Sequence, residues 1–311
     1  MNIVLLDAET LGNVANLEKV KELGHLVSYP RTSPEQVQER IKDANIIITN
    51  KVVLGKSEID AAENLKLICI AATGTNNIDL DYAKSRDIPV KNVAGYSTES
   101  VAQATFSMLL SLINHLSYYD EYAKNDYASS GLFTHIGPTI WELKGKRFGI
   151  IGLGNIGKRV AFIAQAFGCE VVYYSSSGKS RDEKLQRLEL EELLTTSDIV
   201  TIHAPLNEKT KELIGKKELS HMKSNAILIN VGRGGIVVES DLANALEQGE
   251  LAGAGLDVFE KEPVASENPL LKINCPEKLI MQPHVAWSSQ EARETLVEGI
   301  IQNILDANIS I

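Results

Sequence analysis

The strongest constraint on the fold is a glycine-rich turn between an apolar strand and a helix. Residues 150–157 read IIGLGNIG, the strand pattern RFGII leads into them, and the helical pattern KRVAFIAQAF follows. In a dinucleotide-binding βαβ unit the first glycine allows the tight turn, the second lets the backbone approach the pyrophosphate, and the third packs helix against strand. The helix N-terminus then faces the phosphate charge, whereas the alternative is a structural turn without a ligand. The residues predicted to bind the dinucleotide here are Gly152, Gly154, Asn155, Ile156 and Gly157.

The segment that selects between NAD and NADP departs from the NAD pattern. An acidic residue is expected at the end of the second strand, where it binds the ribose 2′-hydroxyl. Ser175 and Ser176 take that place here, and Lys179 and Arg181 follow. Without a carboxylate to repel it, a 2′-phosphate can be accepted by the hydroxyls and the two cations. We therefore predict NAD or NADP as the cofactor, the alternative being a solvated basic loop that only weakens NAD binding.

Strand and helix patterns alternate along the chain. Such alternation predicts an α/β fold with parallel sheets, because parallel neighbours need crossover connections. The strands of the second series are apolar on both faces, as expected of buried parallel strands. The predicted strands cover residues 2–6, 26–29, 45–49, 67–71 and 89–93, and then 147–152, 170–175, 198–204, 226–232, 251–258 and 278–285.

The helical patterns and the chain length predict two domains. A chain of 311 residues exceeds the size at which one core stops growing. With hinges near residues 96–99 and 286–289, we predict a substrate domain of residues 1–98 plus 287–311 and a dinucleotide-binding domain of residues 99–286. Predicted helices include residues 17–24, a segment opened by a capping box at Ser33, one long helix over about 101–124, and a closing helix opened by a capping box at Ser288.

Charge and cysteine content exclude several classes of protein. The chain has 31 basic and 41 acidic residues, a formal charge of −10, which disfavours nucleic acid and anionic membranes as partners. Cys69, Cys169 and Cys275 lie far apart without a C-x-x-C motif, which predicts no disulfide framework, no metal site and a cytoplasmic location. No apolar run reaches the ~20 residues of a membrane span, and the first residues lack the basic region of a signal peptide.

Five motifs, the glycine-rich turn among them, carry a resemblance over essentially the whole chain. They are GIIGLGNIG (149–157), HAPL (203–206), NVGRGGIV (230–237), GLDVFEKEP (255–263) and QPHVAW (282–287). In order and spacing the chain resembles the D-2-hydroxyacid dehydrogenase family, and residues 69–80 and 92–103 are most similar to bacterial glycerate dehydrogenases, also called hydroxypyruvate reductases. The resemblance implies two Rossmann-like or flavodoxin-like doubly wound domains with a cleft between them, a homodimer, and catalytic residues Arg233, Glu262 and His284.

The chemistry of these three residues supports the same roles. Reduction of a 2-keto acid needs a cation for the carboxylate, a hydride donor and a proton for the new alkoxide. Arg233 follows a predicted strand within a glycine-rich turn, where a guanidinium can bind a carboxylate bidentately. His284 directly follows the apolar run KLIMQP (278–283), and imidazole can donate a proton near neutral pH. Glu262, otherwise a solvated loop acid, would orient the imidazole and favour its charged form.

Other positions are predicted with less support from the residues themselves. The turn Ala72-Thr73-Gly74 follows a strand of the first series and can offer backbone N–H groups to a substrate carboxylate, unless it is only a connecting turn. Trp287, next to the histidine motif, can wall the substrate pocket or pack the hinge. The resemblance alone implies that the cofactor also contacts His203, Pro205, Thr210, Val231, Gly232 and Asp257.

The sequence thus predicts an enzyme that transfers hydride between NAD(P)H and a small 2-keto or 2-hydroxy acid. Hydroxypyruvate with D-glycerate, or glyoxylate with glycolate, are the expected substrates. One alternative is a dinucleotide-sensing binding protein of the corepressor type. Another is a formate- or phosphite-type dehydrogenase on the same fold, although formate-type enzymes carry glutamine where Glu262 stands.

Overall fold

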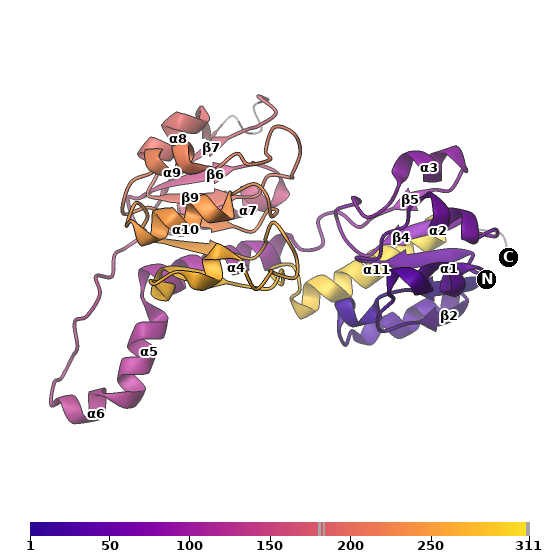
Figure 1. Cartoon of the computed structure of the whole chain (residues 1–311), viewed down its shortest axis with the longest axis horizontal. Helices are drawn as coiled ribbons and strands as arrows, with labels where there is room; N and C mark the ends of the chain where they lie inside the picture. Colours follow the sequence, from indigo (N-terminus) through magenta and orange to yellow (C-terminus); the bar gives the residue numbers. More distant parts are fainter. Residues whose placement is uncertain (180–181, 183, 309–311) are drawn as a thin grey trace. The chain divides into compact units, whose positions relative to one another are not determined.

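The chain divides into two compact units, seen in the computed structural model of Figure 1. The structure describes residues 1–179, 182 and 184–308. The first unit consists of Met1–Ser97 and Ser288–Ile311, and the second of Thr98–Trp287. These boundaries lie one residue from the expected domain limits. Each unit is built on its own parallel sheet.

The first unit carries a sheet of five parallel strands in the order β2-β1-β3-β4-β5. This is the flavodoxin-like order of a doubly wound sheet. In β3 and β4 all residues are buried, because helices cover both faces of the sheet. The strand bounds are β1 Asn2–Leu5, β2 His25–Ser28, β3 Ile46–Thr49, β4 Leu67–Ile70 and β5 Val90–Lys91.

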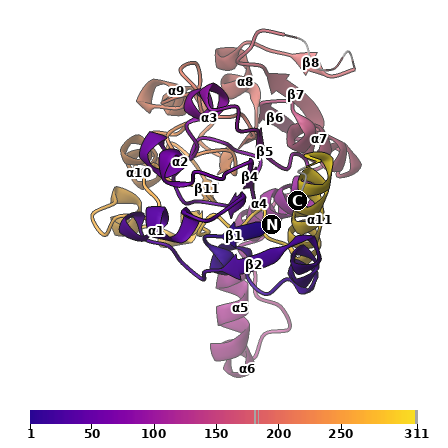
Figure 2. The same ribbon diagram turned by 90° about the vertical axis from the view of Figure 1, so that its right-hand side faces the viewer.

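Two groups of helices cover this sheet, with α1, α2 and α3 on one side and α11 on the other in Figure 2. The helix α11 packs against η2 and β4. The bounds are η1 Ala8–Leu11, η2 Ala15–Leu23, η3 Pro34–Gln36, α1 Val37–Ile41, α2 Lys56–Ala61, α3 Leu80–Ser85 and α11 Gln290–Asp306.

Two helices of this unit differ from the prediction, one in its type and the other in its first residue. The segment predicted as a helix over residues 17–24 is the 3₁₀ helix η2, because Leu17, Val20 and Leu23 recur every three residues and a 3₁₀ helix aligns that spacing on one side. The closing helix begins one residue later than predicted. Ser289, one residue after the expected Ser288, is its N-cap and accepts a hydrogen bond from the Ala292 N–H at 3.2 Å. The capping box at the start of η3 is present.

The second unit carries a sheet of seven parallel strands in the order β12-β11-β10-β9-β6-β7-β8. Its inner strands are buried on both faces, whereas the edge strand β12 is only half-buried, contrary to the prediction, because it has a neighbour on one side alone. The short strand β8 has no counterpart among the predicted strands. The bounds are β6 Arg147–Ile151, β7 Glu170–Tyr174, β8 Gln186–Arg187, β9 Ile199–Ile202, β10 Ile227–Asn230, β11 Gly253–Leu256 and β12 Leu279–Met281.

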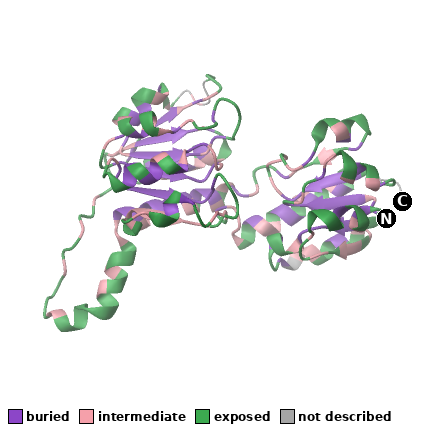
Figure 3. Ribbon diagram, viewed as in Figure 1, coloured by how far each residue is buried: buried purple, intermediate pink, exposed green. Residues whose placement is uncertain are grey.

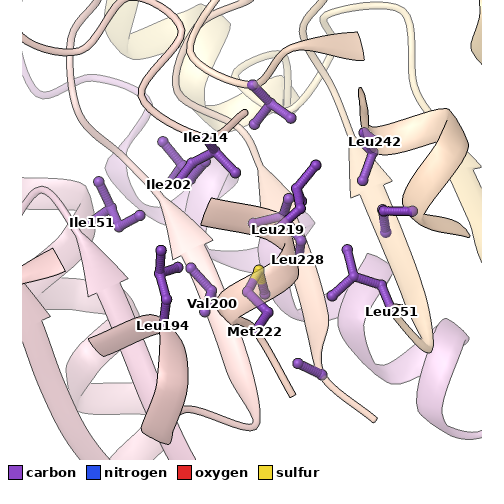
Figure 4. Close-up of a cluster of buried hydrophobic side chains, with 14 of the residues drawn as sticks. Ile151, Leu194, Val200, Ile202, Ile214, Leu219, Met222, Leu228, Leu242 and Leu251 are labelled. Atoms are coloured by element: carbon purple, nitrogen blue, oxygen red, sulfur yellow. The ribbon is translucent and has the colours of Figure 1, made fainter. Parts of the chain in front are cut away.

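Apolar layers on both faces of this sheet form its core, which is purple along the strands in Figure 3. Figure 4 shows one of them, in which Val200 and Leu228 of neighbouring strands meet Leu219 and Leu242 from the covering helices. The helix bounds are α4 Thr98–Ile113, α5 Leu116–Asn125, α6 Tyr127–Ser130, α7 Asn155–Ala166, α8 Leu190–Thr196, α9 Lys216–His221, α10 Glu239–Glu247, η4 Pro269–Lys272 and η5 Pro276–Lys278.

The long helix predicted over about 101–124 is divided into α4 and α5. His115 adopts a left-handed conformation with φ of 48°, which ends α4 and turns the chain. The buried face of α4 ends at Ile113, and α5 has no buried residue. In Figure 1 α5 and α6 extend away from the layers of their own unit. The helix breaks where it no longer has a core to cover.

None of the helices in the described ranges combines the length and the apolar character needed to cross a bilayer.

Candidate active site

The parallel register of the second sheet aligns the carboxyl ends of its strands. Tyr174, Ile151, Ile202 and Asn230 are paired across four neighbouring strands, and the row continues through Leu256 to Met281. Ligands of open α/β sheets bind outside such strand ends. The residues that directly follow these six strands are Ser175, Gly152, His203, Val231, Asp257 and Gln282.

The glycine-rich turn has the shape that a dinucleotide needs. Gly152 has φ of 96°, and a Cβ on it would lie 2.7 Å from the Ala204 nitrogen. A Cβ on Gly157 would lie 2.2 Å from the Gly152 oxygen, so helix α7 packs directly on the turn. A Cβ on Gly154 would meet no atom within 4 Å, which leaves open space at the N-terminus of α7. The turn therefore fits a pyrophosphate approaching the backbone of Asn155 and Ile156, the first residues of α7.

The loop after β7 presents hydroxyls where a ribose-binding acid was expected. Ser175 is buried, with its Oγ 3.0 Å from the Ser177 Oγ, and Ser176 is half-buried. Lys179 is exposed, while Arg181 lies outside the described residues. A cation that sequence analysis missed comes from β8, where Arg187 donates from Nη1 to the Gly178 carbonyl. Only the pairing of β8 with β7 could have shown that Arg187 lies beside this loop.

A carboxylate–imidazole pair lies beyond the ends of β11 and β12. Glu262 Oε2 lies 2.7 Å from His284 Nδ1, and Glu262 Oε1 accepts a hydrogen bond from the Phe259 N–H at 3.0 Å. An ionised carboxylate can only accept, so Nδ1 carries the proton of this hydrogen bond. The other ring nitrogen, Nε2, is then the atom that can exchange a proton with a ligand. His284 itself has φ of 55°, an uncommon conformation for a residue other than glycine.

Asp257 holds the backbone on which His284 is presented. Its carboxylate accepts hydrogen bonds from the N–H groups of Val285 at 2.8 Å and Ala286 at 3.0 Å. Burial raises the pKa of this carboxyl to about 6, although the two N–H donors favour its charged form. Trp287 donates from Nε1 to the His284 carbonyl at 2.9 Å. Trp287 therefore stabilises the same turn, next to the histidine.

The turn that carries Arg233 is held by a residue that sequence analysis missed. Asn230, the buried last residue of β10, donates to the Arg233 carbonyl at 3.0 Å and accepts from the Gly232 N–H at 3.1 Å. Arg233 uses one guanidinium N–H on the Gly232 carbonyl at 2.8 Å and has further donors for an anion. The side chain of Val231 packs in the core. The sequence does contain a sign of this role, because Asn230 is a polar residue at the end of an otherwise apolar strand.

Two side chains of the segment after β9, those of His203 and Thr210, have buried polar atoms. The Nε2 atom of His203 lies 3.1 Å from the Thr201 Oγ1, and Nδ1 is buried without a hydrogen-bond partner. The residue as a whole is half-buried, and burial of its ring lowers the pKa of His203 to about 3. Thr210 is buried and donates to the Pro205 carbonyl at 2.6 Å, so its hydroxyl stabilises this turn, whereas Pro205 itself is exposed.

Ala72, Thr73 and Gly74 belong to the first unit, where they follow β4. The Ala72 carbonyl accepts from the Val93 N–H at 3.1 Å, and the Thr73 hydroxyl donates to the Val93 carbonyl at 3.1 Å. The turn is thus held to the segment after β5.

Thiol and metal chemistry find no support in the described part of the chain. Burial raises the pKa of Cys69 to about 12 and that of Cys169 to about 11, so neither thiol is ionised near neutral pH. No group of three or more potential metal ligands occurs among the described residues.

Comparison with known proteins identifies the family. A family model for the "D-isomer specific 2-hydroxyacid dehydrogenase, NAD binding domain" matches residues 106–286. The chain belongs to the D-isomer specific 2-hydroxyacid dehydrogenase family. The match lies within the second unit and confirms both the resemblance found in the motifs and the predicted α/β fold class.

Two relatives and one solved structure align with nearly the whole chain. A hydroxypyruvate reductase of Blautia hydrogenotrophica is 36% identical, covering 98% of this chain and 96% of that protein. A glycerate dehydrogenase of Methylorubrum extorquens is 35% identical, covering 97% and 94%. The solved structure of an acyclic imino acid reductase in complex with NADPH and D-Arg has a TM-score of 0.87 at 30% identity, covering 98% and 96%.

The buried, neutral His203 predicts a specific loss of stability in acid. Its folded-state pKa of about 3 lies below the ordinary 6.5, so its contribution is complete above pH 6.5 and is lost as the pH falls. Linkage then predicts that at pH 5 wild type loses about 2 kcal/mol more unfolding free energy than His203→Gln, relative to pH 7.5. Urea denaturation at both pH values measures this difference. The exposed His25→Gln is the control and should follow wild type; identical pH dependence in all three proteins would contradict the burial of His203.

Proposed function

We propose that the protein reduces a small 2-keto acid to the D-2-hydroxy acid with NADH or NADPH. The observation that carries the proposal is the Glu262–His284 hydrogen bond at the same edge of the sheet as Arg233 and the dinucleotide turn. The names of two relatives, hydroxypyruvate reductase and glycerate dehydrogenase, favour hydroxypyruvate as the substrate. Glyoxylate, which has the same keto-acid group and no side chain, is the second expected substrate.

The roles of the three side chains follow from their chemistry. When bound, the dinucleotide supplies the hydride that C2 of the keto acid accepts. Arg233 binds the substrate carboxylate and polarises the neighbouring carbonyl. His284, as imidazolium, donates the proton on Nε2 to the C2 oxygen as negative charge develops there. Glu262 accepts from Nδ1 and thereby both orients the ring and stabilises its positive charge.

Two other functions would use the same fold differently. A dinucleotide-sensing protein of the corepressor type would bind NAD(H) without turnover, and a formate- or phosphite-type dehydrogenase would need no proton donor for an alkoxide. The oriented imidazole of His284 favours keto acid reduction over both. A panel of 2-keto acids, formate and phosphite, each with both cofactors, distinguishes the three.

Removal of the proton donor or its partner should give two distinct kinetic results. His284→Ala should lower kcat for keto acid reduction at least ~100-fold and leave dinucleotide affinity nearly unchanged, because only the general acid is lost. Glu262→Gln should move the alkaline limb of the reduction profile to lower pH, because an imidazolium without its carboxylate gives up its proton more readily. Steady-state kinetics between pH 5 and 9 and cofactor titration measure both. Full activity of His284→Ala would remove His284 from the mechanism.

For the cofactor, we propose that NADPH is accepted, alone or together with NADH. Ser175 and Ser177 offer hydroxyls in place of a carboxylate, and Arg187 lies against the same loop through Gly178. Lys179 is exposed in that loop. A 2′-phosphate would find hydroxyl donors and the Lys179 ammonium there, with no acid at the ribose-binding position, whereas Arg187 is paired with Glu189 at 2.8 Å.

A carboxylate in place of Ser175 should reverse this preference. Ser175→Asp should lower kcat/KM with NADPH more than tenfold, about 1.4 kcal/mol of transition-state stabilisation, whereas activity with NADH holds or rises. Lys179→Ala should weaken NADPH use selectively. Comparison of both cofactors in wild type and variants provides the measurement, with Ser175→Ala as the control that removes the hydroxyl without adding charge. A wild type that does not use NADPH would show that this loop excludes the phosphate.

We also propose a homodimer formed through the arm of α5, α6 and the segment after them. These elements extend from their unit in Figure 1 and carry apolar side chains that no core covers, with Phe133 95% and Ile136 88% exposed. An exposed apolar patch of this kind marks a protein interface, and a second copy of the chain is its expected occupant. Other exposed apolar residues of this arm are Leu116, Tyr118, Tyr127, Leu132 and Ile140.

Charges on the arm should dissociate the dimer. Wild type should sediment as a dimer of the 34.0 kDa chain, and Phe133→Asp combined with Ile136→Asp should sediment as a monomer. Phe162→Asp is the matched control, because Phe162 is an exposed apolar residue on α7 and should leave the dimer intact. Analytical ultracentrifugation distinguishes these states. A monomeric wild type, or a dimer that survives both arm substitutions, would contradict the proposal.

A cytoplasmic location is likewise proposed, and the three unpaired cysteines support it, since they fit a reducing compartment.

A further inference from the structure

A buried carboxylate lies behind the catalytic loops, outside the set of residues assigned above. Glu239, the first residue of α10, is only 6% exposed. Its Oε1 accepts a hydrogen bond from the Glu260 N–H at 2.6 Å, and its own N–H donates to the Glu260 Oε1 at 3.1 Å. Glu239 and Glu260 thus hold each other at two points. A carboxylate buried at this depth would cost stability unless donors satisfied it.

The second oxygen of Glu239 is held from another direction. Glu239 Oε2 accepts from the side-chain amide of Asn268 at 2.5 Å, and Asn268 Oδ1 accepts in turn from the Leu270 N–H at 2.9 Å. Asn268 is itself buried. Glu239 is the first residue of α10, where the helix dipole is positive. Both oxygens of Glu239 are therefore fixed by partners distant in sequence.

These contacts act on the loop that carries the carboxylate partner of His284. Glu260 lies two residues before Glu262 and next to Phe259, whose N–H donates to the Glu262 Oε1. The same loop touches the turn of Arg233, since a Cβ on Gly234 would lie 1.7 Å from the Phe259 carbonyl oxygen. The two ends of the segment from Gly234 to Glu239 thus contact Phe259 and Glu260, the first residues of the loop that leads to Glu262.

We propose that Glu239 is a positioning residue that, through Glu260 and anchored by Asn268, holds Glu262 where its carboxylate meets His284. The inference rests on the proposed function for the role of the Glu262–His284 pair. Glu239 touches neither the imidazole nor any part of the substrate in this mechanism. Its effect passes through the backbone of residues 259–262. The kinetic effect of replacing Glu239 should therefore resemble that of replacing Glu262 and not that of replacing Arg233.

The neutral isostere of Glu239 provides the first test. In Glu239→Gln an amide NH₂ replaces Oε2 and faces the NH₂ of Asn268, so two donors oppose each other. We expect kcat for keto acid reduction to fall at least tenfold, the alkaline limb to move toward lower pH as in Glu262→Gln, and KM for the dinucleotide to stay within twofold. The combination of Glu239→Gln with Asn268→Asp restores a donor opposite an acceptor and should bring kcat and the pH profile back to within threefold of wild type.

Two controls separate positioning from a general loss of stability. Asp241→Asn changes a carboxylate in the same first turn of α10, whose Oδ2 accepts a hydrogen bond from the N–H of Lys216, the first residue of α9, at 2.9 Å. It should lower the melting temperature without moving the pH profile. If Glu239→Gln does not fold, Asn268→Ala tests the same contact with the Glu239 carboxylate in place, and a smaller change in the same direction is expected.

A readout independent of turnover completes the experiment. Hydrogen exchange of the peptide covering residues 257–263 should accelerate at least tenfold in Glu239→Gln, stay at the wild-type rate in Asp241→Asn, and return toward it in the double variant. If wild type reduces no keto acid, the proposed function fails, while hydrogen exchange still tests whether the contacts of Glu239 with Glu260 and Asn268 hold the loop. A Glu239→Gln protein with wild-type exchange in this peptide, or with reduced stability but unchanged kcat and pH profile, would overturn the positioning role.

Discussion

The hydrogen bonds that pair β9 with β10, β10 with β11 and β11 with β12 set the geometry of the site. Their register is parallel and unshifted, so Ile202, Asn230, Leu256 and Met281 lie in one row across the sheet. The loops that follow these four residues therefore all begin at the same edge of the sheet. A strand slipped by one residue would turn its side chains to the opposite face and move its loop away from the others. The close packing of both faces of the sheet opposes such slips, because each would force core side chains into the wrong apolar layer.

The loops beyond this row are ordered by buried polar groups rather than by apolar packing. Asp257 accepts hydrogen bonds from the two backbone N–H groups that follow His284, and the Asn230 side chain donates to the Arg233 carbonyl. Glu239 accepts from a backbone N–H of the loop that carries Glu262. Each of these residues is nearly or fully buried, and each hydrogen-bonds at least one backbone group. A site built this way is stiff, because an unpaired buried polar group costs more than the hydrogen bond contributes. Such stiffness is what orientation of a proton donor requires.

The sequence predicts the fold and the approximate position of most strands, because these depend on local patterns. Apolar runs, turns and the G-x-G-x-x-G motif locate the strands that end before Gly152, Ser175 and Asp257. Features that depend on distant partners were not predictable. Glu239 reads as an ordinary acid in a first helical turn, and its burial rests on Glu260 and Asn268, 21 and 29 residues away. The break at His115 and the pairing of Arg187 with the Ser175 loop likewise depend on where the core ends and on which strands meet.

The central claim, that C2 of a keto acid receives hydride from a bound nicotinamide while the protein supplies the proton, is tested most directly by isotope transfer. Hydroxypyruvate is reduced with NADH or NADPH carrying deuterium at C4 of the nicotinamide, using each of the two stereospecifically labelled cofactors, and the glycerate is analysed for configuration and deuterium. The account predicts D-glycerate, with one deuterium at C2 from one of the two labels. L-glycerate, or D-glycerate whose C2 hydrogen comes from water with both labels, would contradict it.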